Sequence, residues 1–176
     1  MTPIFARALG EATFAALPAP VRRLHQGGSF RGEATIDGPG TALARVCARL
    51  LRFPPPGTAV PLRLDILADE HGESWTRHFG MHRMASRLQL SRHGHAIVER
   101  LGAFAVEMEA SGTSEGMTLA VRRWSGLGIP LPPRAAPRGH AREATDNAGR
   151  FTFDIAVDLP FGLGRLVQYR GWLAPV

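Results

Sequence analysis

The chain contains no lysine, one cysteine and one tyrosine, and it lacks any long run of apolar residues. All 21 basic residues are therefore arginine, which a bias in the coding sequence explains better than a special role for arginine. Cys47 alone cannot form an intramolecular disulfide or a cysteine-rich zinc site. No stretch approaches the roughly 18 apolar residues that cross a bilayer. Residues 1–7 lack the charged start and apolar run of a secretory signal, so we expect a cytoplasmic protein.

The length of 176 residues is enough for one domain with a well-buried core. No repeat, low-complexity tract or linker divides the chain, so we expect a single domain over residues 1–176. Residues 1–26 are predicted to form a broken helical segment that ends at Pro18 to Pro20 and packs on a sheet. The net charge of +6 describes the basic character better than the pI of 11.2, because arginine does not deprotonate.

Most of the remaining chain alternates apolar and polar residues, which is typical of half-buried strands. The clearest example is the C-terminal hairpin, in which Phe151 to Leu159 alternate before the turn at residues 160–164. Turn-forming clusters separate the strands at regular spacing. We therefore expect an α+β, mainly antiparallel fold: a calycin-like barrel or strongly curved sheet, with a short helical N-terminus. A helix-grip fold is the alternative, but it requires a long C-terminal helix, and this chain ends in a strand pattern.

One amphipathic helix is predicted after the first strand, over Thr41 to Arg52. Its apolar residues recur at helical spacing, and we expect that stripe to be buried against the sheet; it comprises Leu43, Val46, Cys47, Leu50 and Leu51. The opposite side carries Arg45, Arg49 and Arg52 with no acid among them. These arginines fit an ordinary solvated face, but they could also contact phosphates on nucleic acid or anionic lipid.

Several motifs suggest chemistry that their context does not support. Residues 112–116 match the nucleophile elbow of hydrolases but lie between two predicted strands, which indicates a hairpin loop. The pairs Gly126/Gly128 and Gly162/Gly164 lack the third glycine and following helix of a phosphate loop. The closely spaced histidines have no third ligand near them; they are His78, His82, His93 and His95. We therefore expect no cofactor and no metal.

Five segments carry a resemblance to a known family. They are residues 17–25 (LPAPVRRLH), 75–80 (WTRHFG), 128–132 (GIPLP), 149–154 (GRFTFD) and 167–173 (VQYRGWL). Together they resemble a bacterial family of unknown function that occurs alone or behind saccharopine-dehydrogenase-like NAD(P)-binding domains. The resemblance implies at most a neighbouring oxidoreductase as a partner, and it carries over no catalytic residue.

Arginines and aromatic residues within the strand patterns are the candidate site residues. If the apolar faces point inward, the guanidinium groups there must find carboxylates or a ligand anion. The predicted ligand-binding residues are Trp75, Arg77, Phe79, Arg123, Trp124, Arg170 and Trp172. Tyr169 and Glu143 are the candidates for a general acid or base. An internal salt-bridge network, or an error of one residue in the strand register, would also account for the arginines.

These features predict a barrel that binds a small apolar or amphipathic molecule, including an anionic one. Such a protein would be an accessory protein or a cofactor-independent isomerase or cyclase. The alternative is an interaction module whose arginines contact an acidic partner, nucleic acid or a membrane surface. The scattered tryptophans argue against nucleic acid. Ligand identity, turnover and oligomeric state stay open.

Overall fold

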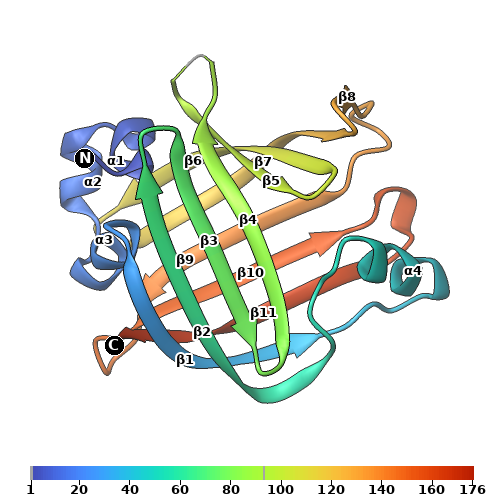
Figure 1. Cartoon of the computed structure of the whole chain (residues 1–176), viewed down its shortest axis with the longest axis horizontal. Coiled ribbons are helices and arrows are strands. Elements are labelled where there is room, and N and C mark those ends of the chain that lie inside the picture. The colour runs from blue at the N-terminus through green and yellow to red at the C-terminus, as the bar shows by residue number, and fades with distance from the viewer. Residues whose placement is uncertain (1, 93) are drawn as a thin grey trace.

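The computed structural model describes residues 2–92 and 94–176, and its main feature is a closed antiparallel barrel (Figure 1). Its strands are β1 (Gly28–Asp37), β2 (Gly57–Asp69), β3 (Gly72–Phe79), β4 (His82–Leu90), β5 (Ala96–Leu101), β6 (Phe104–Thr113), β7 (Gly116–Gly126), β8 (Ile129–Pro130), β9 (Arg138–Thr145), β10 (Phe151–Asp158) and β11 (Arg165–Pro175). The helices are α1 (Ile4–Leu9), α2 (Glu11–Ala16), α3 (Ala19–His25) and α4 (Ala42–Leu50), with a short 3-10 turn, η1 (Pro160–Gly162).

Ten strands close the barrel in simple up-and-down order. Each strand pairs with its neighbours along the chain, β7 continues directly to β9, and β11 returns to pair with β1. The short β8 only extends β7 as a side hairpin. The predicted mainly antiparallel barrel is therefore confirmed. The helix-grip alternative is excluded, because the sheet closes on itself through the β6–β7 pairing instead of wrapping around a long helix.

The alternation of side chains gives the barrel an apolar interior. Phe30, Ala34 and Ile36 of β1 are buried, and every strand except the two-residue β8 contributes side chains to the same core. The ladder between β1 and β11 is especially tight at two glycines. A Cβ on Gly171 would lie 2.0 Å from the carbonyl oxygen of Glu33, and one on Gly32 would lie 1.9 Å from that of Trp172. Only glycine fits where the two strands close the barrel.

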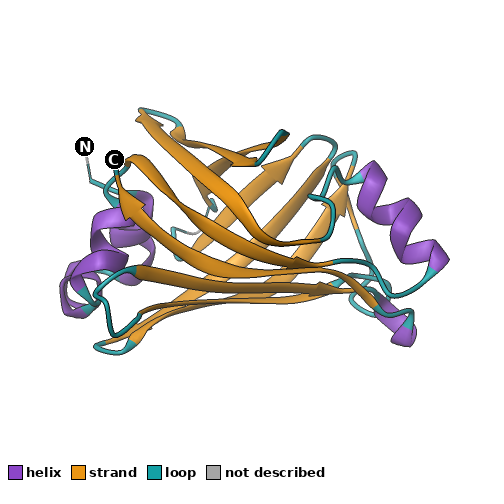
Figure 2. Ribbon diagram, turned by 90° about the horizontal axis from the view of Figure 1, so that it is seen from below, coloured by secondary structure: helices purple, strands orange, loops and turns teal. Residues whose placement is uncertain are grey.

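The two ends of the barrel carry different helices (Figure 2). α1, α2 and α3 lie together at one end, where they contact β4, β5, β6, β9 and β10. α4 follows β1 at the other end and contacts β11. In the described part of the chain, no helix combines the length and apolarity needed to span a membrane.

The orientation of α4 differs from the sequence prediction. The helix starts as expected, with the Thr41 hydroxyl accepting a hydrogen bond from the Ala44 amide, but it buries Ala44 and Ala48. Three residues of the predicted buried stripe are instead exposed: Leu43, Val46 and Leu50. The helix approaches its neighbours through its small side chains, and strand side chains already fill the barrel beneath. The larger residues are therefore left facing outward.

Candidate functional site

Arg77 on β3 lies inside the barrel and is held by partners on two neighbouring strands. Its Nη1 donates to the Ser86 hydroxyl over 2.9 Å, and its Nη2 donates to Glu99 Oε1 over 3.1 Å. The guanidinium carbon lies 5.0 Å from the centre of the Trp75 ring, within the range of a cation–π contact. Glu99 thus neutralises a guanidinium that would otherwise be costly to bury.

A second polar pair joins the helical end to the barrel wall. His25, the last residue of α3, is fully buried, and its Nε2 lies 2.5 Å from Glu143 Oε2 on β9. The Phe5 ring covers the imidazole with a centroid distance of 3.8 Å. The other ring nitrogen, Nδ1, is buried without a hydrogen-bond partner among the described residues. Glu143 therefore orients an imidazole that keeps one nitrogen free.

Glu73 is the third acid beneath the N-terminal helices. One carboxylate oxygen accepts the Ile4 amide over 3.1 Å, and the other accepts the Trp75 indole N–H over 3.0 Å. Both interactions are buried, so this carboxylate is used in fixing α1 to the barrel. Both oxygens of Glu73 already accept hydrogen bonds from the protein, whereas Nδ1 of His25 has no partner among the described residues.

Tyr169 lies between these groups, on β11. Its ring meets Phe79 edge-on at a centroid distance of 5.5 Å, and it lies 6.2 Å from that of Phe153. Burial raises the pKa of the phenol to about 12, and the nearby Arg77 only partly opposes this effect. No hydrogen bond of its hydroxyl is found in residues 2–92 and 94–176. The side chain is thus a neutral phenol with an unused donor.

Two small cavities adjoin each other at Tyr169. One, of about 60 Å³, reaches toward α4 and is bordered by Met84, Glu99 and Trp124. The other, of about 40 Å³, is bordered by Arg77 and Glu143, and both cavities share Tyr169 and Ile155. Each has room for only a few waters. A drug-sized ligand therefore needs the interior to repack.

Trp124, which borders the 60 Å³ cavity, carries an unsatisfied donor. The indole N–H of Trp124 is buried, and it has no hydrogen-bond partner among the described residues. A buried donor without a partner is costly, commonly by about 1–3 kcal/mol. An acceptor placed in this cavity would relieve that cost.

The barrel wall beside this cavity has a gap in its strand pairing, between β4 and β5. β5 pairs with β4 only over Arg87 to Leu90, so the half of β4 nearer α4 has no partner on this side. A surface hollow of about 460 Å³ lies beside that gap, next to the end of α4. Met84 and Leu101 border both the hollow and the cavity, so two side chains separate the interior from solvent.

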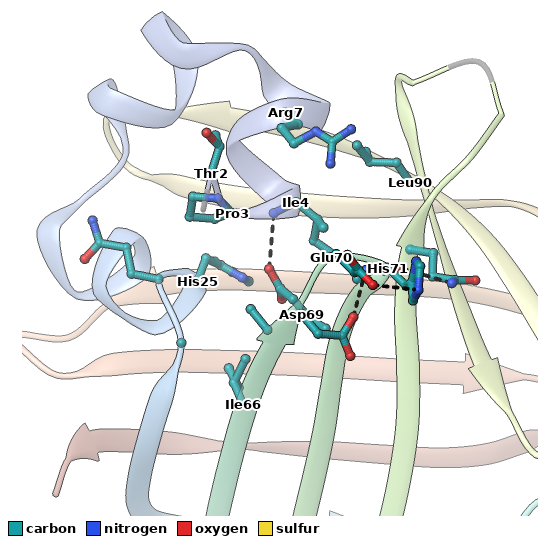
Figure 3. A pocket seen from close by; sticks show the side chains of 16 residues that line it. Thr2, Pro3, Ile4, Arg7, His25, Ile66, Asp69, Glu70, His71 and Leu90 are labelled. Carbon is teal, nitrogen blue, oxygen red and sulfur yellow. Dashed lines mark hydrogen bonds and ion pairs between the residues drawn. The ribbon is translucent and has the colours of Figure 1, made fainter.

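Two further hollows flank the helices. Figure 3 shows the one at the N-terminal end, of about 530 Å³, between α1 and the β2–β3 turn. Its rim is polar and includes Asp69, whose pKa an ion pair with Arg87 lowers to about 2. The other, of about 520 Å³, lies between the arginine side of α4 and the loop containing Pro54 to Pro56.

The structure places six of the predicted site residues in the interior and three on the outer face. Buried are Trp75, Arg77, Phe79, Trp124, Glu143 and Tyr169. The expectation that Arg123, Arg170 and Trp172 face inward is corrected: the two arginines are exposed, and Trp172 is half-buried on the outside. Arg170 pairs with Asp37 there over 3.1 Å, and Arg150 stacks on the Trp172 ring at 4.2 Å.

A β-bulge explains the position of Arg123. The register of β6 against β7 shifts between the Glu107–Arg123 pair and the Met108–Val121 pair. Arg122 is therefore an extra residue on β7, and the alternation restarts with Trp124 inside and Arg123 outside. For β11, strict alternation suffices: because Tyr169 points inward, Arg170 and Trp172 must point outward.

Three buried polar residues in the described part of the chain were not among the predicted site residues: Glu73, Ser86 and His25. Ser86 lies at an inward position of the β4 pattern, so its place could have been read from the alternation. His25 ends a helix before a glycine pair, and nothing local indicates that it meets Glu143, 118 positions away. Of the other histidines, His82 contacts the Arg52 carbonyl oxygen over 2.9 Å, and His93 lies outside the described residues. The hydrolase-like segment forms the β6–β7 hairpin, with its serine in the exposed turn.

Comparison with known proteins identifies the family. The chain belongs to the family described as "Domain of unknown function (DUF4166)", whose model matches residues 17–173. No curated protein matches the sequence. Among solved structures, the chain is similar to a zebrafish ileal bile acid-binding protein complexed with cholic acid, with 11% identity and a TM-score of 0.42, covering 86% of this chain and 98% of that one.

Proposed function

We propose that the barrel binds a small, mostly apolar molecule that carries a neutral oxygen acceptor. The observation that supports this best is the indole N–H of Trp124, buried without a partner beside a cavity. Tyr169 borders the same cavity. A carbonyl, ether or hydroxyl oxygen between the two side chains would satisfy both donors, while the surrounding apolar side chains hold the rest of the ligand.

The charge balance of the interior favours a neutral ligand over an anion. Arg77 is the one arginine buried in the described part of the chain, and it is already paired with Glu99. Glu73 and Glu143 are buried as well, so the acids inside outnumber the arginine. An added carboxylate would meet more negative than positive charge. Of the apolar and anionic ligands that the sequence suggests, the interior therefore favours the uncharged ones.

Flexible methionine side chains beside the cavity allow it to enlarge around such a ligand. Met84 and Met108 border the 60 Å³ cavity, and methionine adapts its shape through three rotatable bonds. Rotation of Met84 together with Leu101 would also join the hollow at the β4–β5 gap to the interior. Met84 would then contribute to both cavity size and ligand entry.

Native mass spectrometry of the protein purified from its own cells is the first test, because it identifies a retained ligand directly. Binding of Nile red, a neutral apolar dye with a carbonyl oxygen, gives the second. We expect Trp124→Phe to weaken dye or ligand binding about tenfold, since it removes the indole N–H donor while keeping an aromatic ring at this position. Trp172→Phe is the matched control on the outer face. Equal effects of the two substitutions would contradict an interior site.

A second candidate function, acid–base catalysis without a cofactor, rests on the His25–Glu143 pair. The 2.5 Å contact and the unpartnered Nδ1 are the arrangement of an oriented general base. His25 itself borders the N-terminal hollow, whereas Glu143 and Tyr169, the neutral acid, border the interior cavity of about 40 Å³. Such a site suits an isomerase or cyclase. Without turnover, the protein would be an accessory carrier, for example to a neighbouring oxidoreductase.

Deuterium uptake separates the carrier from the enzyme. The co-purified ligand is incubated with the protein in heavy water, and incorporation at carbon is followed by mass spectrometry. If His25 moves a proton of the ligand, the wild type catalyses incorporation and His25→Gln abolishes it while still binding Nile red. Absence of incorporation by the wild type would leave binding intact and refute the catalytic role.

A further inference from the structure

The outer face of α4, a helix of nine residues, exposes three large apolar side chains. Leu43, Val46 and Leu50 are 50%, 53% and 73% exposed, while the helix packs inward through Ala44 and Ala48. The three exposed residues share one side of the helix at i, i+3 and i+7 spacing. The helix therefore buries small residues and exposes large ones. A helix that only covers a core would bury its large apolar residues.

Unpaired arginines flank this apolar stripe. Arg45, Arg49 and Arg52 are exposed, and none of them forms an ion pair within residues 2–92 and 94–176. Arg83 of β4 is likewise exposed and unpaired there, and it borders the same hollow as Leu50. The positive charge beside the stripe is thus left without neutralisation by the protein. A negatively charged partner would supply it.

A second exposed apolar group lies next to the start of α4. Phe161 is 74% exposed at the turn between β10 and β11, and its φ of 58° is a strained conformation for a bulky residue. The turn is tied to α4, because the Thr41 hydroxyl donates to the Leu163 carbonyl oxygen over 2.9 Å. Strain is therefore retained in a segment that exposes an aromatic ring and is tied to the start of α4.

We propose that this face of α4 docks on the surface of an anionic lipid bilayer. Apolar side chains flanked by arginines are the pattern of a helix that lies in the interface, with its apolar residues among the acyl chains and its guanidinium groups at the lipid phosphates. Leu50 and Arg52 also border the hollow beside the β4–β5 gap. Docking in this way would hold the entrance of the barrel against the membrane, where apolar molecules concentrate.

This inference does not depend on the ligand proposed for the interior. Vesicle binding can be measured with an empty barrel. Nile red binding by the wild type and by Trp124→Phe can be measured without a membrane. Failure of one proposal therefore leaves the other testable.

The test is co-sedimentation with vesicles of phosphatidylglycerol mixed with phosphatidylcholine, compared with vesicles of phosphatidylcholine alone. We expect binding only to the anionic vesicles, decreasing with salt. Leu50→Ser should weaken it about tenfold or more, because a leucine that inserts loses its apolar burial. The triple variant Arg45→Gln, Arg49→Gln, Arg52→Gln should weaken it about a hundredfold, at roughly fivefold for each arginine near the surface.

Two matched variants control for these changes. Leu67→Ser removes an exposed leucine from the outer face of β2, and Arg31→Gln, Arg100→Gln, Arg142→Gln removes the same charge elsewhere. Both should bind vesicles nearly as the wild type does. All altered side chains are exposed, so unchanged thermal unfolding is expected and is measured for each variant. Equal losses in the control variants would overturn the proposal, because net charge or general apolarity would then explain binding.

A fluorescent reporter distinguishes insertion from purely electrostatic attraction. Because Cys47 is the single cysteine, Cys47→Ala with Leu50→Cys gives one attachment site for a nitrobenzoxadiazole dye. We expect a blue shift and brighter emission with anionic vesicles, and none with heparin. A response to heparin or nucleic acid instead would identify a different acidic partner. A dimer in analytical ultracentrifugation that Leu50→Ser dissociates, without vesicle binding, would identify a second copy; either result refutes the bilayer.

Discussion

The two ends of the barrel are both covered by helices, yet they are built in opposite ways. At the N-terminal end, Phe5, Leu17 and Leu24 are almost completely buried, and α1 and α3 are joined to the wall through Glu73 and the His25–Glu143 pair. At the other end, α4 fully buries only Ala44 and Ala48, half-buries Cys47 and exposes its three larger apolar residues.

This difference shows that a helix at the end of a barrel need not be packed into its core. The N-terminal helices are part of the core, so their removal would expose apolar surface and leave buried acids unpaired. α4 covers its end loosely, beside the gap between β4 and β5. The first end therefore serves stability, and the second is available for ligand entry and surface contact.

The largest expected effect contrasts one apolar residue from each end. Phe5→Ala should lower the free energy of unfolding by about 3–5 kcal/mol, because it opens a cavity over the His25 ring. Leu50→Ala should change it by no more than about 0.5 kcal/mol, because the side chain is already exposed. Urea unfolding followed by circular dichroism measures both values. Similar losses would mean that α4 is as much a part of the core as α1.

Loss of the buried His25–Glu143 pair beneath the N-terminal helices should lower the free energy of unfolding more than loss of an exposed pair on the barrel wall. Glu143→Ala leaves His25 buried without its partner and should cost about 3 kcal/mol of unfolding free energy. Glu109→Ala removes the exposed 2.7 Å pair with Arg122 and should cost less than about 1 kcal/mol.

A double-mutant cycle sharpens this prediction. His25→Leu together with Glu143→Leu should recover part of the loss, because no buried polar group is then left unpaired. Strictly additive losses, measured by urea unfolding, would show that the two side chains do not act as a pair.

Alkaline pH tests the interior between the two ends. Burial raises the pKa of Tyr169 to about 12, compared with 10.0 for an unperturbed phenol. The unfolded chain then loses this proton first, so stability is unaffected below pH 10 and falls by roughly 3 kcal/mol as the pH rises toward 12. Tyr169→Phe should remove this decline.

The titration itself can be followed directly, because Tyr169 is the single tyrosine. The ultraviolet absorbance of tyrosinate in the folded protein reports this residue alone. A midpoint near that of a free phenol would show that the interior is wet. A ligand whose oxygen accepts from the hydroxyl should raise the midpoint further.

The smallest effect concerns the rim of the N-terminal hollow. The ion pair with Arg87 lowers the pKa of Asp69 to about 2, so its contribution to stability is present above the ordinary aspartate pKa and is lost as the pH falls toward 2. Arg87→Gln should raise the pKa of Asp69 toward its ordinary value of 3.8, as measured by nuclear magnetic resonance of the carboxyl carbon. An unchanged low pKa would assign the effect to the His71 amide, which also donates to this carboxylate.

Much of the fold and part of the site could be predicted because strand alternation is a local property. Along β3, the positions of Trp75, Arg77 and Phe79 follow directly from their spacing. The same rule fails at Arg123, because a bulge one residue away reverses the faces and leaves no mark in the sequence.

The sequence by itself determined the up-and-down antiparallel barrel, the helix after β1 and the inward faces of the regular strands. These features depend on backbone periodicity, which side chains encode residue by residue. Only the tertiary structure decided that His25 meets Glu143, that the buried Trp124 N–H has no partner among the described residues, and that the large apolar residues of α4 face outward. Each of these depends on how distant elements pack, and such packing is set by the shape of the whole interior rather than by any one segment.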